Sequence, residues 1–236
     1  TLLPNIPAQA EAHFGVPACG AVLNTINTRL DADTVAYIFG HAGAKIVLCD
    51  TAFLPLAQEA IRRMEGTAPE IIEVVDHGFT ASGAYLTYEA LLANGDPSAP
   101  WIMPEDEWES IAINYTSGTT GRPKGVVYSH RSTVLHTLVA SLGDFWSLRG
   151  TDVVLPVTPM FHANSWGIPY GAVMMGVKMV FPGPHLHPDD LLDLMQLEPP
   201  TLSLGVPTIW MGLIQAYEAA LTQQPGRWKL PACMRS

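Results

Sequence analysis

The chain has 236 residues and a formal net charge of −10, with 48% hydrophobic and only 14% charged residues. The acidic balance argues against general nucleic-acid binding and against electrostatic docking on anionic lipid. The longest stretch without Asp, Glu, Lys or Arg covers residues 153–177. It contains several prolines together with His162 and Asn164, so it predicts a strand, a loop and a helix rather than a transmembrane segment.

Short β-rich runs alternate with helical patterns along the chain. The predicted strands are residues 45–49, 71–75, 111–115, 126–128, 153–157, 177–181 and 201–204. The predicted helices are residues 33–42, 54–64, 88–93, 132–145, 166–175, 189–197 and 208–221. This alternation predicts an α/β fold of mostly parallel sheets covered by helices.

Two segments have a distinct character within this pattern. Residues 94–109 are polar, acidic and rich in proline, which predicts a surface connection between two sheet regions. The helix predicted at 132–145 has an apolar stripe at helical spacing, formed by Val134, Leu135, Leu138, Val139 and Leu142.

The three cysteines, Cys19, Cys49 and Cys233, show no Cys-x-x-Cys spacing. A sparse, odd set of this kind is typical of a reducing compartment, and we interpret the three residues as small apolar side chains. No basic stretch followed by an apolar run marks a signal peptide. These features predict a cytoplasmic protein.

Residues 115–130 read Y-T-S-G-T-T-G-R-P-K-G-V-V-Y-S-H and combine glycines, hydroxyl residues and one lysine. Glycines let successive backbone N–H groups form a concave nest for phosphate oxygens, and Lys124 adds a mobile positive charge. The Walker motif needs a Gly-Lys pair followed by Ser or Thr and a helix, whereas Lys124 precedes Gly125 and a β-rich run. We therefore predict a phosphate-binding loop that joins two strands, 110–115 and 126–128; an ordinary Gly/Thr-rich hairpin turn is the alternative.

The segment T-S-G-T-T-G-R-P-K-G at 116–125 resembles the phosphate-loop signature of the adenylate-forming, or AMP-binding, superfamily, and P-M-F-H-A-N-S-W-G at 159–167 resembles its next core motif. Residues 14–30 and 155–170 are most similar to its medium- and long-chain fatty acyl-CoA ligase branch. The resemblance extends over essentially the whole chain. It implies that residues 1–236 are part of the large N-terminal domain of an acyl-CoA synthetase-like fold, truncated at both ends and without the C-terminal domain.

The resemblance also implies roles for individual residues. Thr116 would be the residue that binds Mg²⁺. Lys124 and His162 would be catalytic: Lys124 would steady the leaving pyrophosphate, and His162, with the residues after it, would line the junction of the acyl and nucleotide pockets. The backbone of Ala163 would lie against the nucleotide. The β- and γ-phosphates would be wrapped by Ser117, Gly118, Thr119, Thr120 and Gly121. Trp166 matches a tryptophan that gates the acyl tunnel. A buried core histidine and a buried core tryptophan are the alternatives for His162 and Trp166.

The activity implied is that of an ATP-dependent fatty acyl-CoA ligase, whose substrates are a fatty acid, ATP and coenzyme A, with Mg²⁺ as the metal. The carboxylate is already an anion at pH 7, so no general base is needed to create this nucleophile. A ligase for a short, sulfur-containing or aryl acid is one alternative, and a non-catalytic nucleotide-binding protein on the same fold is another. A homodimer of the full-length protein and peripheral membrane contact stay open.

His185 and His187, followed by Asp189 and Asp190, could suggest a metal site, but the surrounding prolines favour a solvated loop. The resemblance implies that residues 204–208 form the floor of the acyl pocket, with Pro207 starting a helix that carries Trp210. The segment G-Y-G-x-T-E, the ribose-binding Asp and the C-terminal lysine of the family do not occur, so the 236-residue piece is expected to be inactive by itself.

Overall fold

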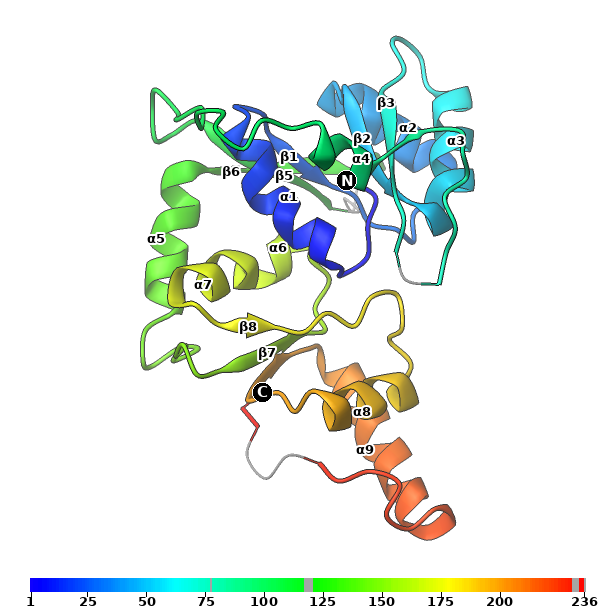
Figure 1. Ribbon diagram of the computed structural model, residues 1–236, viewed down its shortest axis with the longest axis vertical. Helices are drawn as coiled ribbons and strands as arrows, with labels where there is room; N and C mark the ends of the chain where they lie inside the picture. The colour runs from blue at the N-terminus through cyan, green and yellow to red at the C-terminus, as the bar shows by residue number, and fades with distance from the viewer. Residues whose placement is uncertain (77, 117–120, 231–233, 236) are drawn as a thin grey trace. The chain divides into compact units, whose positions relative to one another are not determined.

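A computed structural model describes residues 1–236 except 77, 117–120, 231–233 and 236. The chain forms two compact units (Figure 1). The first unit comprises Thr1–Val134 with Met160–Asn164, and the second comprises Leu135–Pro159 with Ser165–Ser236.

The first unit contains two sheets and the helices that cover them. Its elements are α1 (Pro7–Ala18), β1 (Leu23–Thr25), α2 (Ala32–Ala42), β2 (Ile46–Asp50), the 3₁₀ turn η1 (Thr51–Phe53), α3 (Leu54–Arg63), β3 (Glu70–Val74), β4 (Leu86–Thr87), α4 (Tyr88–Ala93), β5 (Ser110–Thr116), β6 (Lys124–Ser129) and the first turn of α5 (His130–Ala140).

One sheet of the first unit has the order β2-β3-β4, with all three strands parallel. The helices α2 and α3 lie beside it in Figure 1 and share its apolar core, in which Val35, Phe39 and Ala57 are almost fully buried. Capping defines both ends of α2: the Asp31 carboxylate accepts a hydrogen bond from the Thr34 N–H, and Gly43 closes the helix at φ 63°. The sequence therefore specifies this helix locally as well as by its apolar face.

The other sheet of the first unit has the order β1-β5-β6. Strand β5 pairs with β1 in parallel and with β6 antiparallel, so β5 is the central strand of this sheet. The β5–β6 pair confirms the prediction that the glycine-rich run joins two strands.

The second unit is built on the parallel sheet β8-β7-β9. Its elements are β7 (Val153–Pro156), α7 (Ile168–Met175), β8 (Lys178–Met179), α8 (Pro188–Leu197), β9 (Leu202–Leu204) and α9 (Pro207–Gln223). The helices α8 and α9 lie side by side (Figure 1) and bury Leu191, Leu192 and Leu213 against Leu155. Between β7 and α7 the chain forms the short element α6 (Ala163–Trp166), which is described with the site.

The predicted α/β class with mostly parallel pairing is confirmed. Each predicted strand and helix has a counterpart, with the same bounds for α4 and with one or both ends shifted for the others. The elements α1, β1, η1, β4 and α6 were not predicted. The helix predicted at 132–145 is α5, which ends at Ala140, so that prediction was wrong at its C-terminal end. Its apolar stripe is also not its buried face: Thr133, Thr137 and Ala140 are buried, whereas Val134 and Val139 are more than half exposed.

Residues 94–109 are largely exposed, as predicted for a surface connection. None of the described helices combines the length and hydropathy that a membrane crossing requires.

The cysteines differ from one another in burial. Cys49 is fully buried, as expected for a small apolar side chain, and burial raises the pKa of its thiol to about 12. Cys19 is exposed, and Cys233 lies outside the described residues.

Candidate active site

The predicted phosphate loop connects the two strands of the β5–β6 hairpin. Thr116 and Lys124 face each other as the last residue pair of the ladder, and Tyr115 faces Gly125 one step further in. Both Thr116 and Lys124 are exposed, so a hydroxyl and an ammonium group flank the base of the loop. The predicted site residues Ser117, Gly118, Thr119 and Thr120 lie outside the described residues.

Two glycines at the loop have backbone requirements that other residues do not meet. Gly121 has φ 115°, a value that L side chains rarely adopt. A Cβ on Gly125 would lie 2.6 Å from Ile113 Cδ1 and 3.3 Å from Tyr115 Cζ. The absence of a side chain at Gly125 therefore lets β6 approach the β5 side chains closely.

A cluster of aromatic and basic side chains connects α2 to the base of the loop. His41 Nδ1 lies 2.7 Å from the Tyr115 hydroxyl, and the His41 ring stacks on Tyr37 at a centroid distance of 5.2 Å. The Arg122 guanidinium lies over the Tyr37 ring, 5.4 Å from its centroid. Burial, and then the neighbouring Tyr37, raises the pKa of Tyr115, which keeps its hydroxyl protonated. The i, i+4 spacing of Tyr37 and His41 was the sequence signal for this cluster.

The second predicted motif is held by buried polar side chains of the first unit. Asn5 Oδ1 accepts a hydrogen bond from Met160 N at 2.8 Å. The carbonyl oxygen of Phe161 accepts from Thr25 Oγ1 at 3.4 Å and from Asn114 Nδ2 at 3.3 Å. Strands β1 and β5 each contribute one of these donors, so the segment is fixed to adjacent strands of one sheet.

Residues Ala163–Trp166 form a single turn in which each residue has a positive φ, between 46° and 56°. A left-handed turn of non-glycine residues costs about 1–2 kcal/mol per residue, so other interactions must stabilise it. Asn164 and Ser165 are buried, and they bond to Asn114 Nδ2 (3.3 Å) and to the Thr158 carbonyl (2.8 Å), respectively.

The other predicted site residues of this motif, His162, Ala163 and Trp166, are not buried. His162 is exposed and Trp166 is 38% exposed, so neither is a buried core residue. Ala163 belongs with His162 to the first unit, and Trp166 belongs to the second.

Strand β5 connects the two motifs within the first unit. Thr116 stands at the loop, and Asn114, two residues earlier on the same strand, donates to both Phe161 and Asn164. Sequence reasoning missed Asn5, Thr25 and Asn114, because single polar residues in apolar runs carry no spacing signal. Their only mark was that each interrupts an otherwise hydrophobic or strand-like segment.

His13 on α1 adds a buried histidine to this region. Its Nδ1 lies 2.7 Å from the Gln9 carbonyl oxygen, and its side chain also bonds to Asn164. Burial lowers the pKa of His13 to about 4, against which both hydrogen bonds act. The imidazole is therefore neutral at pH 7.

The other residues that the sequence singled out lie in the second unit. Pro188 begins α8, and Asp189 forms an ion pair with Arg227 at 3.1 Å. Within the described ranges, no group of three or more His, Cys, Asp or Glu side chains could hold a metal ion. Pro207 begins α9 as predicted, and Trp210 Nε1 donates to the Gly205 carbonyl oxygen at 3.1 Å.

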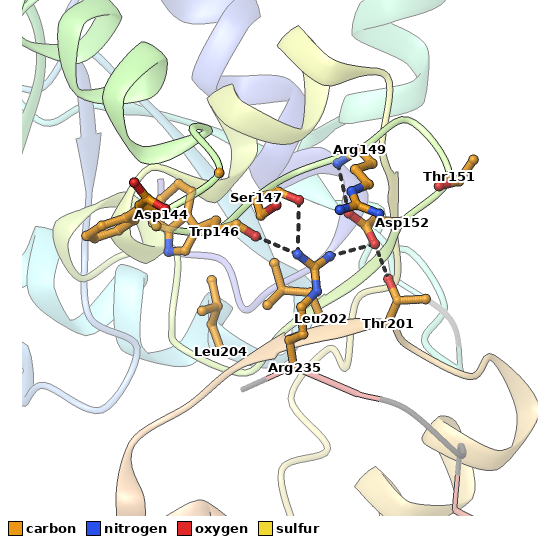
Figure 2. Close-up of a pocket in the computed structure, with 12 residues that line it drawn as sticks. Asp144, Trp146, Ser147, Arg149, Thr151, Asp152, Thr201, Leu202, Leu204 and Arg235 are labelled. Carbon is orange, nitrogen blue, oxygen red and sulfur yellow. Dashed lines mark hydrogen bonds and ion pairs between the residues drawn. The ribbon is translucent and has the colours of Figure 1, made fainter.

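The second unit contains a cavity of about 880 Å³ (Figure 2). The Arg235 guanidinium donates to the carbonyl oxygens of Trp146 and Ser147 and pairs with Asp152 at 2.7 Å. Burial opposes ionisation of Asp152, but hydrogen bonds from Thr201 and Arg235 outweigh it and lower the pKa of the carboxyl group. None of the predicted site residues that the structure describes lines this cavity, and the Arg235 guanidinium is engaged by other groups of the protein.

Comparison with known proteins identifies the family. The family model described as "AMP-binding enzyme" matches residues 1–232. A long-chain-fatty-acid–CoA ligase of Thermus thermophilus is 47% identical over 209 residues, which cover 89% of this chain and 37% of the relative. A 3-methylmercaptopropionyl-CoA ligase of Ruegeria pomeroyi is 42% identical over 223 residues, covering 93% of this chain and 41% of the relative. The chain thus spans about two-fifths of the length of these relatives.

Solved structures agree on the fold. A long-chain-fatty-acid–CoA ligase from Archaeoglobus fulgidus superposes with a TM-score of 0.76 at 20% identity, covering 92% of this chain and 41% of that one. ATP-bound MatB from Rhodopseudomonas palustris gives a TM-score of 0.71 at 24% identity, covering 89% and 39%. From the match of the family model over residues 1–232, the chain belongs to the AMP-binding enzyme family.

Proposed function

We propose that this chain is part of an ATP-dependent fatty acyl-CoA ligase. The observation that carries the proposal is the β5–β6 hairpin, in which exposed Thr116 and Lys124 face each other at the base of a glycine- and hydroxyl-rich loop. Such a loop suits the polyphosphate of ATP, because backbone N–H groups and one mobile cation can neutralise several oxygens together. The relatives named above, which act on fatty acids and on a thioether acid, support the same reaction class.

In the proposed reaction, a carboxylate oxygen of the acid attacks the α-phosphorus of ATP, and the bond to the leaving pyrophosphate breaks. The thiol of coenzyme A then forms the thioester and AMP leaves. Lys124 follows the loop at the start of β6 and would compensate the charge that develops on the pyrophosphate. Thr116 offers a hydroxyl at the same end of the hairpin and fits a Mg²⁺ ligand. When bound, Mg²⁺ would supply further charge neutralisation on the phosphates.

The nature of the acid is the open part of this proposal. A fatty acid is our first choice, because the long- and medium-chain ligases are 47% and 42% identical to this chain. The thioether-acid relative, also 42% identical, favours a short sulfur-containing acid as the second candidate. An aryl acid, a cytoplasmic location, a homodimer and peripheral membrane contact remain predictions.

The test is carboxylate-dependent exchange of pyrophosphate into ATP by the full-length protein. The acids should run from acetate to palmitate and include 3-methylmercaptopropionate and benzoate. Exchange that peaks at medium or long chains would support the fatty-acid proposal, and a peak at the thioether acid would support the second candidate. ATP binding without exchange for any acid would contradict both and would favour a non-catalytic nucleotide-binding protein.

A further inference from the structure

The segment with the exposed His162 continues into a turn whose backbone conformation is unfavourable. Four consecutive non-glycine residues, Ala163–Trp166, have φ between 46° and 56°. Left-handed φ in non-glycine residues persists only where the surroundings determine it. The described structure must therefore contain groups that hold this turn, and they are found on the inward side of the segment.

Asn114 is the donor at the centre of these groups. It is 3% exposed, and its single Nδ2 group lies within hydrogen-bonding distance of Thr25 Oγ1, the Phe161 carbonyl oxygen and Asn164 Oδ1. An amide nitrogen has two hydrogens, so three acceptors share two donor positions. Asn114 thus bonds to the residues before and after the His162–Ala163 pair.

Neighbouring groups of the same unit restrict the segment further. The Asn5 side chain accepts from Met160 N, and the His13 side chain bonds to Asn164. All of these anchors are at least nine-tenths buried, and removing one leaves its partner unsatisfied in a dry environment. His162 itself is exposed and has none of these contacts, so its place depends on the anchors of its neighbours.

We propose that Asn114 is a positioning residue: its amide holds residues 161–164, the segment that leads into the left-handed turn, and thereby places His162 and Ala163 next to the strand that carries the predicted phosphate loop. This inference rests on the proposed ligase function, because it assigns His162 and Ala163 to the site of that reaction. Asn114 acts through Phe161 and Asn164 and touches no reacting atom. Its position on β5, two residues before Thr116, couples the turn and the loop through one rigid strand.

The experiment uses the full-length protein with Asn114→Ala, Asn164→Ala, the double variant, and Thr25→Val, which keeps the shape of the side chain but removes its hydroxyl. We expect Asn114→Ala to lower kcat for acid-dependent pyrophosphate exchange by about tenfold to a hundredfold while the KM for ATP changes less than about threefold. Asn164→Ala should have a similar effect, and the double variant should be little worse than either single variant. Thr25→Val should show a smaller loss of kcat, again with little change in the KM for ATP. It provides the test if Asn114→Ala does not fold.

A matched control is Glu73→Gln, which alters another buried polar cluster of the first unit, around Ser82 and Thr51. It should lower the melting temperature without altering the ratio of kcat to KM. If Asn114 had a merely structural role, Asn114→Ala would also lower the melting temperature without altering the ratio of kcat to KM. That outcome would overturn the proposal, and so would fully additive effects in the double variant.

A second measurement does not depend on activity. Limited chymotrypsin digestion, read by mass spectrometry, should cut after Phe161 or Trp166 at least about fivefold faster in Asn114→Ala and Thr25→Val than in Glu73→Gln of equal stability. Equal cutting would contradict the positioning role even if the ligase proposal stands. Faster cutting in a protein without any acid-dependent exchange would leave Asn114 as the anchor of the turn and remove the ligase function, so the two failures are distinguishable.

Discussion

His41 Nδ1 lies 2.7 Å from the hydroxyl oxygen of Tyr115, the residue that precedes Thr116 at the entrance of the predicted phosphate loop. This hydrogen bond joins the last turn of α2 to the end of β5. Tyr37, one helical turn before His41, stacks on the imidazole and lies under Arg122 at the other side of the loop. Both ends of the loop are therefore connected to the same face of one helix.

Tyr115→Phe removes the hydroxyl of this bond and keeps the ring. A single hydrogen bond contributes about 1 kcal/mol, so we expect ATP to bind up to about fivefold more weakly in the full-length protein. Isothermal titration with ATP and Mg²⁺ measures the change. Tyr85→Phe is the matched control, since that hydroxyl bonds to Gln58 Nε2 in another part of the first unit. Equal affinities for both variants would exclude the α2 contact from ATP binding.

Lys124→Ala should slow adenylation without affecting folding. Loss of a cation that stabilises the leaving pyrophosphate costs about 2–4 kcal/mol in the transition state, or about 30- to 1000-fold in rate. Lys124 is exposed and has little packing to lose. Pyrophosphate exchange in the full-length protein reports the rate. Lys178→Ala, which removes a surface ion pair with Glu198, should leave it unchanged. An unaltered rate in Lys124→Ala would show that the lysine makes no contact with phosphate.

Trp166→Ala tests whether the exposed tryptophan restricts entry of the acid. With 38% of its surface exposed, the indole has less packing to lose than a core residue. We expect the preference among acids of different length to change more than the KM for ATP. A uniform loss across all acids, together with a lower melting temperature, would instead indicate that the indole fills a core position.

Gly167→Ala should destabilise the protein for two reasons. Gly167 has φ 84°, and an added Cβ would lie 2.9 Å from His136 Nδ1. Gly226 has nearly the same φ, 83°, but no atom within 4 Å of the added Cβ. We therefore expect Gly226→Ala to lower the unfolding free energy by about 1 kcal/mol, and Gly167→Ala to lower it by at least about 1 kcal/mol more. Urea unfolding of the two variants separates the backbone cost from the steric cost, and equal losses would rule out a steric contribution.

The buried His13 predicts a dependence of stability on pH. Burial lowers its pKa to about 4 in the folded protein, below the ordinary value of 6.5. On acidification the unfolded chain therefore takes up the proton first, so stability is fully present above pH 6.5 and is lost as the pH falls toward 4. The loss from this residue approaches about 3 kcal/mol. The unfolding free energy of His13→Gln should depend less on pH between 6.5 and 4, and an equal slope would mean that His13 is not buried as a neutral group.

The elements that sequence could predict are those with a periodic apolar face or a cap. The helix α2 begins at Asp31 and ends at Gly43, and both residues are readable signals. The helix α1 was missed because Ala8, Gln9, Ala10, Ala12 and His13 are all buried, which leaves no contrast between an apolar and a polar face. Strands β1 and β4 were missed because three and two residues are too short for alternation to show.

The candidate site likewise has one part that the sequence could predict and one part that it could not. Its loop could be found because glycines, hydroxyls and a lysine stand close together in the sequence. Its supporting residues could not, because Thr25, Asn114 and Phe161 meet only after β1 and β5 have paired. The end of α5 at Ala140 was misjudged because Leu142 and Phe145 continue the apolar spacing, although both are exposed. Their spacing indicates a helix, but the chain turns back, with Trp146 N donating to the Ala140 carbonyl oxygen.

The two sheets of the first unit place different demands on the order of folding. Strands β2, β3 and β4 follow one another along the chain and pair in that order, whereas β5 pairs with β1 across all of them. Closing the longer loop costs more chain entropy, so β1–β5 pairing should come after the local sheet has formed. In pulsed hydrogen exchange during refolding, we expect the β2 and β3 amides to gain protection before those of β5. Strand β5, which carries the predicted loop, would then pair only after the β2-β3-β4 sheet has formed. A variant that destabilises this sheet should therefore delay the appearance of ATP binding.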